Sequence, residues 1–501
     1  MGGLRKGTYR DTDLTPEQIS AELNADYILG PRVHGGALAS SGEVRVSAEL
    51  VRSSTAAQLW AGSYTAAQMD GLLDLMSDVA TNVAGELGLS LGDQEQQLLS
   101  ARPTDNQEAY DYYLRGNAAL RRSFDPADFR EAADLFSRAV ALDGSFTLAW
   151  VGLGRAHTEI YRFRGDRRAE RLEMARAALD SAMALDANLA ELRLALGIYH
   201  YHGFLDYDRA LEELAVAQRS APNNHQVHGW AGAVYRRQGE FELAISSFER
   251  ALELDPGSHI VAAELGVTLT GTGRFSEARS SSQLAISLYP QFTEAYRDLA
   301  VGHMLEGNLA EAAATLRRAV DRNTILEVVR YWYLVLLLDG DLQDAVATLQ
   351  LTEQVADTGS YYLTRAFARR ARGDAEGARV LFESAAASLI QRARVTQDDY
   401  FTDSNLGIAY AGAGHRELAL QAGRRAVEIL PLERDRWAGP DMLVALGNIH
   451  LLLGDVEGAV GQYQRVVTLP SRGAYYRAWL RHHPFYEPFR VDPRFQRLLE
   501  E

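Results

Sequence analysis

The sequence contains no cysteine among its 501 residues. This absence excludes disulfides, thiolate metal sites and cysteine nucleophiles. It also has no run of about 18 apolar residues, so no segment is expected to span a membrane. Basic residues are not in excess, since 51 Lys and Arg stand against 67 Asp and Glu, a formal charge of −16. The chain therefore lacks the basic character of a nucleic-acid-binding protein, and we expect no nucleic acid among its partners.

Motifs for catalysis and cofactor binding are absent too. There is no G-x-x-x-x-G-K-[ST] phosphate loop, no H-E-x-x-H zinc motif, no G-x-S-x-G nucleophile elbow and no kinase H-R-D or D-F-G set. The best metal-like cluster is the segment YHYH, which contains His200 and His202. Two positions apart on a helix, these side chains point about 200° apart and cannot share one ion. We expect no catalytic residue, no cofactor and no metal.

The sequence does contain a 34-residue repeat between residues 223 and 324. Apolar residues recur at helical spacing on both sides of a Gly turn in each unit, which predicts two helices per unit. One such hairpin cannot bury its own apolar face, so the units must stack. Small residues occupy two columns at this spacing, Ala244, Ala278 and Ala312 in one and Ala251, Ala285 and Ala319 in the other.

This pattern resembles the tetratricopeptide repeat, whose unit is a helix hairpin of 34 residues. It predicts a mostly α chain, in which residues 108–480 form a right-handed superhelical solenoid of about ten hairpins. Alanine at the helix crossings allows a close approach of the two backbones. Residues 481–501, rich in Phe and Tyr, are expected to cap the last hairpin. The first alanine column continues in both directions at looser spacing: Ala132, Ala175, Ala210, Ala244, Ala278, Ala312, Ala345, Ala378, Ala419 and Ala459.

The N-terminal part has a different pattern. In EVRVSAELV, polar and apolar residues alternate as in a half-buried strand. Residues 27–29 and 58–64 are expected to form two further strands, followed by a helix over 69–87. The segments AELNADYILGPRV, SGEVRVSAELV and AAQLWAGSYTA resemble the second half of the TolB amino-terminal-like (FlgO-like) domain.

The TolB-like resemblance implies a partial α+β domain over residues 17–99, without the strand and helix with which the family domain opens. We therefore expect the sequence to begin inside a domain. Residues 1–16 would be disordered or a partial N-terminus, and residues 100–107 a linker.

A half-domain of this kind, followed by about ten repeats and a D-P-R-F segment, is similar to the C-terminal region of bacterial multidomain Ser/Thr kinases, adenylate cyclases and transcriptional regulators. The resemblance implies a non-enzymatic protein-interaction scaffold, the sensing or docking arm of a bacterial signalling protein. The alternative is a C-terminal fragment of a Ser/Thr kinase or adenylate cyclase whose catalytic domain lies upstream of Met1. Alone, the chain favours a cytoplasmic location. As part of a membrane-anchored kinase it would be extracytoplasmic.

Members of the repeat family bind a peptide or protein mainly on the concave face, which the first helix of each hairpin lines. We expect the corresponding side chains here to contact a partner, with Asn117 beside Arg155, and we expect exchange of Arg155 and Arg236 for Ala to leave folding intact. The alternative is an ordinary solvated helix face. The lysines of the family's carboxylate clamp are absent, which disfavours a chaperone-type acidic tail as ligand. No feature specifies an oligomeric state. The groove positions carried onto this chain are Tyr113, Asn117, Arg155, Thr158, Tyr201, Arg236, Glu294 and Arg297.

Overall fold

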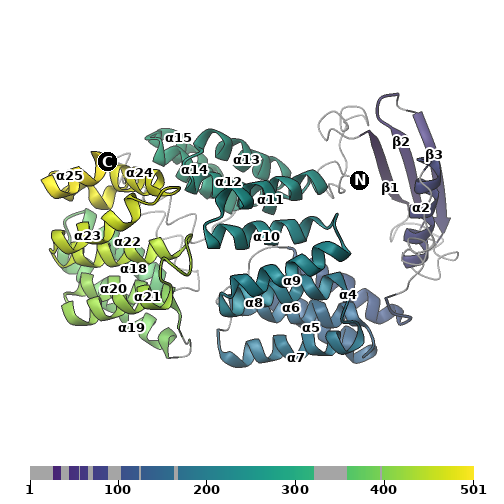
Figure 1. Ribbon diagram of the computed structural model, residues 1–501, viewed down its shortest axis with the longest axis horizontal. Helices are drawn as coiled ribbons and strands as arrows, with labels where there is room; N and C mark the ends of the chain where they lie inside the picture. The colour runs from purple at the N-terminus through teal and green to yellow at the C-terminus, as the bar shows by residue number, and fades with distance from the viewer. Residues whose placement is uncertain are drawn as a thin grey trace. The chain divides into compact units, whose positions relative to one another are not determined.

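The chain is mostly helical, with a small antiparallel sheet near its N-terminus (Figure 1). It divides into two compact units, one of Met1–Glu159 with Met174–Leu192 and the other of Ile160–Glu173 with Arg193–Glu501. The computed structural model describes residues 26–34, 45–55, 57–65, 72–88, 103–122, 126–162, 167–320, 358–394, 396 and 398–500.

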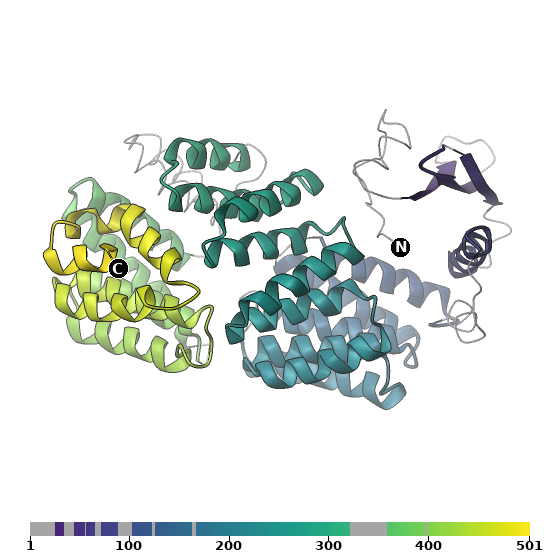
Figure 2. The same cartoon turned by 45° about the horizontal axis from the view of Figure 1, so that its top comes forward.

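The first unit opens with three strands and a helix, in the order that the sequence predicts. Helix α2 lies along the sheet (Figure 2), where the Tyr64 hydroxyl donates to an Asp78 carboxylate oxygen at 2.5 Å. The second strand buries Ala48 and Leu50, as the alternation predicts. It also buries Val51, because the pairing register shifts between Leu50 and Val51. The elements are β1 (Tyr27–His34), β2 (Arg45–Arg52), β3 (Ala57–Thr65) and α2 (Leu72–Glu86).

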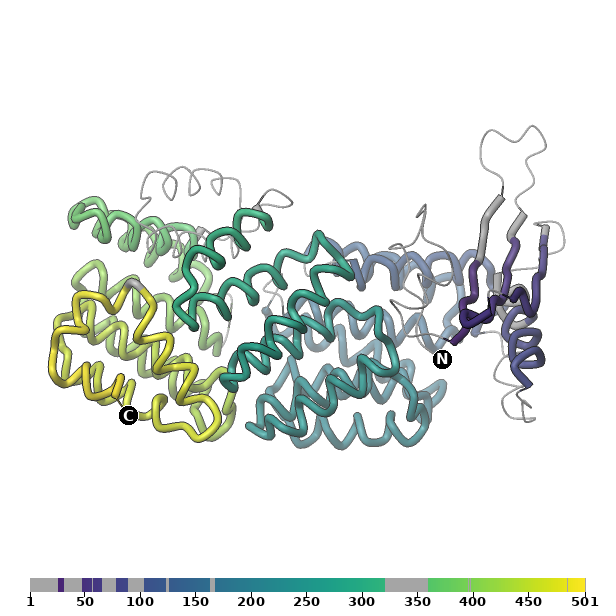
Figure 3. The backbone as a smooth tube through the Cα atoms, turned by 90° about the horizontal axis from the view of Figure 1, so that it is seen from above, coloured from purple at the N-terminus to yellow at the C-terminus, as the bar shows by residue number. Residues whose placement is uncertain are grey.

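Helix hairpins make up most of the rest of the described chain, up to α23, and the hairpin predicted around Ala345 lies outside the described residues. From α9 to α15, each hairpin packs against the next one along the chain (Figure 3). The hairpins are α4 (Gln107–Leu120) with α5 (Pro126–Leu142), α6 (Thr147–Arg162) with α7 (Ala169–Leu185), α8 (Ala190–Phe204) with α9 (Tyr207–Ser220), α10 (His225–Gln238) with α11 (Phe241–Leu254), α12 (His259–Gly271) with α13 (Phe275–Leu288), α14 (Thr293–Leu305) with α15 (Leu309–Val320), α18 (Thr358–Ala371) with α19 (Ala375–Ala393), α20 (Tyr400–Ala413) with α21 (Arg416–Ile429), and α22 (Gly439–Leu452) with α23 (Val456–Val467).

The alanine column lies where the helices cross. Every described member of the first column is at most 3% exposed, which confirms the predicted crossings. Ala251, Ala285 and Ala319 of the second column are also fully buried. A larger side chain at these positions would separate the helices, since protein interiors are closely packed.

Local signals set the ends of the central helices. The Asn224 side chain accepts a hydrogen bond from the Gln226 N–H and so caps the start of α10. The end of α10 is closed by Gly239 at φ +88°, a left-handed conformation that glycine adopts without steric cost. These signals fix where α10 stops, and therefore place its last residues at the edge of the hairpin stack.

The C-terminal segment follows the last hairpin and consists of α24 (Gly473–His482), a 3₁₀ helix at Pro484–Phe489 and α25 (Pro493–Glu500). Tyr486 and Phe495 are buried against Tyr463 of α23. Helix α24 also packs beside α14 (Figure 1), where Trp479 covers a cluster that includes Tyr296. The end of the second unit thus contacts hairpins from the middle of the repeat array.

Candidate partner-binding surface

The eight positions predicted for partner binding divide into two groups by burial. Thr158, Tyr201 and Arg236 are buried, with 0, 3 and 6% of their surface exposed. The other five are partly exposed. Helix α4 carries Tyr113 and Asn117, α6 carries Arg155 and Thr158, α8 carries Tyr201, α10 carries Arg236, and α14 carries Glu294 and Arg297.

Burial corrects the expected exposure of Thr158 and of Arg236. The Thr158 hydroxyl donates to the Gly154 carbonyl of its own helix at 2.9 Å, so it is not available to a partner. Arg236 is buried for a tertiary reason, because Trp437 of a distant loop in the second unit lies against it. Tyr201 is buried in a core cluster that includes Tyr207 and Trp230. The expectation that Arg236 tolerates exchange for Ala assumed an exposed side chain, and the burial of Arg236 contradicts that assumption.

Three predicted residues of the first unit lie together. Burial raises the pKa of Tyr113, and a hydrogen bond with Asn117 opposes this shift. Two charged side chains have smaller effects on the pKa of Tyr113. Glu191 raises it and Arg155 lowers it, so both charges are nearby. Burial lowers the pKa of Arg155 itself. An aromatic ring, an amide and a guanidinium from α4 and α6 thus converge on one partly exposed patch.

The two predicted residues of α14 belong to the second unit. Arg297 forms an ion pair with its neighbour Asp298, with Nε and Oδ1 2.8 Å apart. Its side chain keeps 23% of its surface exposed. Glu294 is partly buried one turn earlier on the same helix. This pairing balances the charge of Arg297.

The loop that covers α10 joins α21 to α22 and comprises residues 430–438, the α21–α22 loop (Figure 1). Its Asp435 is completely buried. One carboxylate oxygen accepts hydrogen bonds from the Tyr207 hydroxyl at 2.7 Å and from Arg237 Nη1 at 3.0 Å. The other oxygen accepts from two backbone N–H groups of the loop at 2.9 and 2.8 Å. Arg237 also donates through Nε to the Tyr201 hydroxyl at 3.1 Å, which fixes its guanidinium.

Two residues further along the loop, the Trp437 ring lies near two guanidinium groups. The Arg236 guanidinium carbon lies 4.9 Å from the ring centre, and that of Arg472 lies 4.1 Å away. Both distances are within the range of cation–π attraction. Two residues fix the position of the Arg236 guanidinium. Its Nη2 lies 2.6 Å from Glu264 Oε2, and its Nη1 donates to the Thr268 hydroxyl at 3.1 Å. Although burial acts to raise it, the pKa of Glu264 is lowered by the Arg236 charge.

The loop approaches the backbone of α10 and α12 very closely. A Cβ atom at Gly271 would lie 2.4 Å from a ring carbon of Trp437, so only glycine fits there. The Arg436 N–H donates to the Arg237 carbonyl at 2.7 Å. On the α8–α9 turn, Leu205 adopts φ +52° and packs on a cluster at the end of α21. We refer to Tyr201, Tyr207, Arg236, Arg237 and Gly271 as the α10 site.

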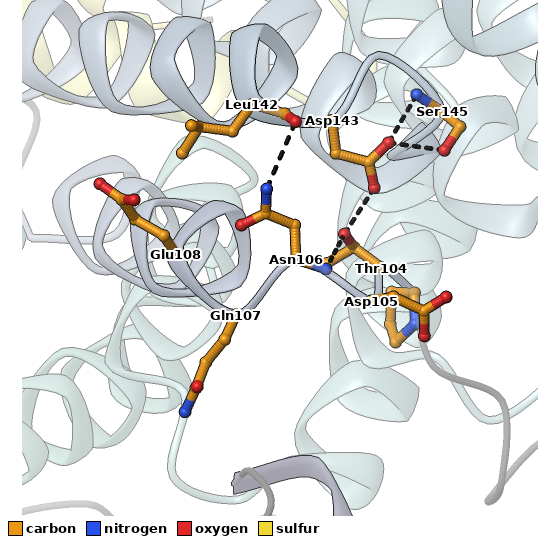
Figure 4. A pocket seen from close by; sticks show the side chains of 9 residues that line it. Thr104, Asp105, Asn106, Gln107, Glu108, Leu142, Asp143 and Ser145 are labelled. Atoms are coloured by element: carbon orange, nitrogen blue, oxygen red, sulfur yellow. Dashed lines mark hydrogen bonds between the residues drawn. The ribbon is translucent and has the colours of Figure 1, made fainter.

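A separate surface depression of about 890 Å³ lies in the first unit, at the start of α4 (Figure 4). Its polar groups bond to one another. Thr104 and Ser145 hydroxyls both donate to the Asp143 carboxylate, and Asn106 caps α4 while donating to the Leu142 carbonyl. This network joins the start of α4 to the α5–α6 turn, and it contains none of the predicted partner-binding residues.

Within the described residues, no group of three or more His, Asp or Glu side chains is arranged to hold a metal ion. His202 is buried, and burial holds its pKa well below the usual value. Its ring lies edge-on to Trp230 at 5.2 Å. No described helix is long and apolar enough to cross a membrane.

The docking of the α21–α22 loop on the α10 site is not predicted by the sequence patterns. One signal was present, because the spacing from Ala419 to Ala459 is 40 residues, six more than the repeat length of 34. An extension of this kind marks a longer connection. It does not indicate where the connection docks, because the α10 site is brought to it only by the stacking of the intervening hairpins.

Comparison with known proteins identifies the repeat type. Residues 203–259 and 264–324 match the family model described as tetratricopeptide repeat. The chain contains tetratricopeptide repeats. A Rhizobium meliloti (strain 1021) protein named "Putative adenylate cyclase 3" is 24% identical over 151 residues, which are 30% of this chain and 25% of that protein. The chain thus spans about a quarter of this curated relative's length.

Three solved structures are similar to parts of the chain. They are MamA (21% identity, TM-score 0.28, covering 33% of this chain and 93% of that one), YrrB, titled a TPR protein with an unusual peptide-binding site (20%, 0.28, 39% and 96%), and the human IFIT1 dimer with PPP-AAAA (17%, 0.41, 72% and 78%).

Proposed function

We propose that this chain is a non-enzymatic scaffold that binds a protein or peptide partner, and that it serves as the docking arm of a bacterial signalling protein. Tetratricopeptide repeats are in general protein-interaction scaffolds and not catalytic domains. The observation that supports binding most directly is that Tyr113, Asn117 and Arg155 lie on the first helices of two successive hairpins and are all partly exposed. We refer to these three residues as the α4–α6 patch.

The chemistry of the α4–α6 patch favours a negatively charged or amide group on the partner. A guanidinium offers a planar fork of donors to a carboxylate, and an Asn side chain both donates and accepts. Tyr113 adds a ring face that packs against Phe146 with the ring centres 5.0 Å apart. Because the whole chain is acidic, a partner that is basic or neutral apart from one carboxylate would bind without general repulsion.

A signalling context is supported by the similarity to the Rhizobium meliloti protein and by the TolB-like pattern of residues 17–99. The second candidate function, a piece of a kinase or cyclase, rests on the same similarity. The DNA directly before the Met1 codon discriminates between the two. A kinase or cyclase reading frame that continues into Met1 favours the enzyme, and a stop codon favours a separate scaffold. In either case we expect the purified chain neither to hydrolyse ATP nor to cyclise it.

Partner capture tests the binding proposal. The full chain is used as bait in a bacterial lysate, and captured proteins are identified by mass spectrometry. We expect the double variant Asn117→Ala with Arg155→Ala to lose a set of proteins that the unaltered chain retains. Arg115→Ala is the matched control, because Arg115 lies on α4 with 58% of its side chain exposed. If the double variant folds normally and captures the same proteins at the same salt, the partner does not bind at the α4–α6 patch.

A further inference from the structure

The α21–α22 loop is longer than the corresponding loop of a regular repeat. Helix α21 ends at Ile429 and α22 begins at Gly439, which leaves nine residues between them (439 − 429 − 1). Between α11 and α12, which end and begin at Leu254 and His259, there are four (259 − 254 − 1). The additional length lets the loop reach the α10 site of the same unit.

The contact is built from charged groups that are removed from water. Arg236, Arg472 and Asp435 are all buried where the loop docks. Burying a charge costs several kcal/mol before pairing offsets it, so an apolar contact would join two hairpins more cheaply. What charged groups add is recognition, because only a carboxylate and an aromatic ring at the correct spacing satisfy Arg237 and Arg236 together.

Docking of the loop also has unfavourable free-energy contributions that no contact offsets. In the described part of the chain, the Nε groups of Arg236 and Arg472 are buried without a hydrogen-bond partner. Leu205, beside the loop, has a positive φ, a backbone conformation that is strained for a non-glycine residue. Undocking would release both costs. The docked arrangement is therefore well defined in geometry and open to displacement by a competitor.

We propose that the α10 site is a docking site for a peptide with a carboxylate two residues before an aromatic ring, and that the chain's own Asp435 and Trp437 occupy it in the resting state. This inference rests on the proposed scaffold function, and it adds a second binding surface with a defined ligand chemistry. A partner peptide would place its carboxylate between Tyr207 and Arg237. Its aromatic ring would lie on Arg236 and over Gly271, where no side chain blocks the backbone.

A partner peptide must compete with the chain's own loop for the α10 site. A tethered segment competes at an effective concentration in the mM range for a short flexible connection, so a free peptide binds well only when the loop is weakened. Binding of the partner and docking of the loop are mutually exclusive. Release of the loop would also break the hydrogen bond from the Arg436 N–H to the Arg237 carbonyl of α10.

The test uses the full chain and a fluorescein-labelled peptide, PLERDRWAG, which has the sequence of residues 431–439. The opened variant combines Asp435→Asn with Trp437→Ala. We expect fluorescence polarisation to show binding to the opened variant at least about tenfold tighter than to the unaltered chain. The control peptide PLERNRAAG should not bind, and adding Arg237→Gln to the opened variant should abolish binding of the first peptide.

A folded opened variant that binds neither peptide, or binds both equally, would overturn the proposal. Circular dichroism reports whether the opened variant folds. If the opened variant does not fold, the test measures hydrogen exchange of the unaltered chain instead. Excess PLERDRWAG should then speed exchange of the Arg436 amide, while PLERNRAAG should not, and equal exchange with both peptides would equally refute the inference. Loss of lysate capture through Arg155 is independent of this result, so failure here leaves the scaffold proposal standing.

Discussion

Arg236 of α10 places its guanidinium 4.9 Å from the centre of the Trp437 ring, which belongs to the α21–α22 loop. The two residues are far apart in the sequence, and the fold of the second unit brings the α21–α22 loop next to α10. This relationship explains why a first-helix position with the pattern of a groove residue is buried. It also means that a substitution at a residue such as Gly271 can alter the α10 site through the position of the loop.

Gly271→Ala should displace the α21–α22 loop. The added methyl group would lie 2.4 Å from a Trp437 ring carbon, a distance that requires the ring to move. We expect a loss of about 1–3 kcal/mol of stability, as for overpacking of a core. Chemical denaturation measures the loss, and hydrogen exchange of residues 430–438 shows whether it is local.

Gly302→Ala is the matched control for Gly271→Ala. Gly302 is also a helical glycine, and a methyl group added to it would meet no atom within 4 Å outside its own stretch of helix. Alanine has the higher helix propensity, so this control should gain roughly 0.5–1 kcal/mol. Equal effects of the two substitutions would contradict the close approach of Trp437.

Arg236→Ala should destabilise the second unit, contrary to the expectation from sequence. It removes the cation above Trp437 and leaves the Glu264 carboxylate without its ion-pair partner. Breaking a buried pair by removing one member costs about 3–5 kcal/mol, and the partial exposure of Glu264 places this case at or below the lower end. Urea unfolding measures the change. Arg250→Ala is the control, because its ion pair with Glu253 is exposed and worth about 0–1 kcal/mol.

The repeat period, the strand order and the alanine crossings could be predicted because each depends on residues close in sequence. Ala244 and Ala278 follow from a period, and Gly239 from a turn. The docking of Asp435 and Trp437 could not be predicted in this way. It depends on the summed geometry of several hairpins, and a loop of charged residues with one Trp has no periodicity that indicates a buried position.

Ala278→Leu should overpack the crossing of α12 and α13, where Ala278 is 2% exposed. We expect a cost of about 1–3 kcal/mol, measured as a lower urea midpoint. Because stacked repeats contact mainly their neighbours, faster hydrogen exchange should be confined to α11–α14. Gln283→Leu, on the exposed side of α13, should change stability by no more than about 0.5 kcal/mol. A uniform loss of protection over the whole unit would contradict local coupling between hairpins.

Stability should fall in mild acid because of His202. Burial is the main cause of its lowered pKa, and the charges of Arg162, Arg237 and Arg167 act in the same direction. In the unfolded chain, histidine binds a proton at roughly pH 6.5. Below that pH the unfolded state therefore binds more protons than the folded state, and the free energy of unfolding decreases as the pH falls.

His202→Phe tests this dependence, since it keeps a ring against Trp230 and removes the titrating group. Urea unfolding should be compared at about pH 7.5 and about pH 5.5, over which one such histidine contributes up to about 1.4 kcal/mol per pH unit below its unfolded pKa. The variant should lose less stability over this interval than the unaltered chain. Burial also lowers the pKa of His259, so part of the dependence should remain. If His202→Phe loses as much stability in acid as the unaltered chain, His202 does not resist protonation in the folded state.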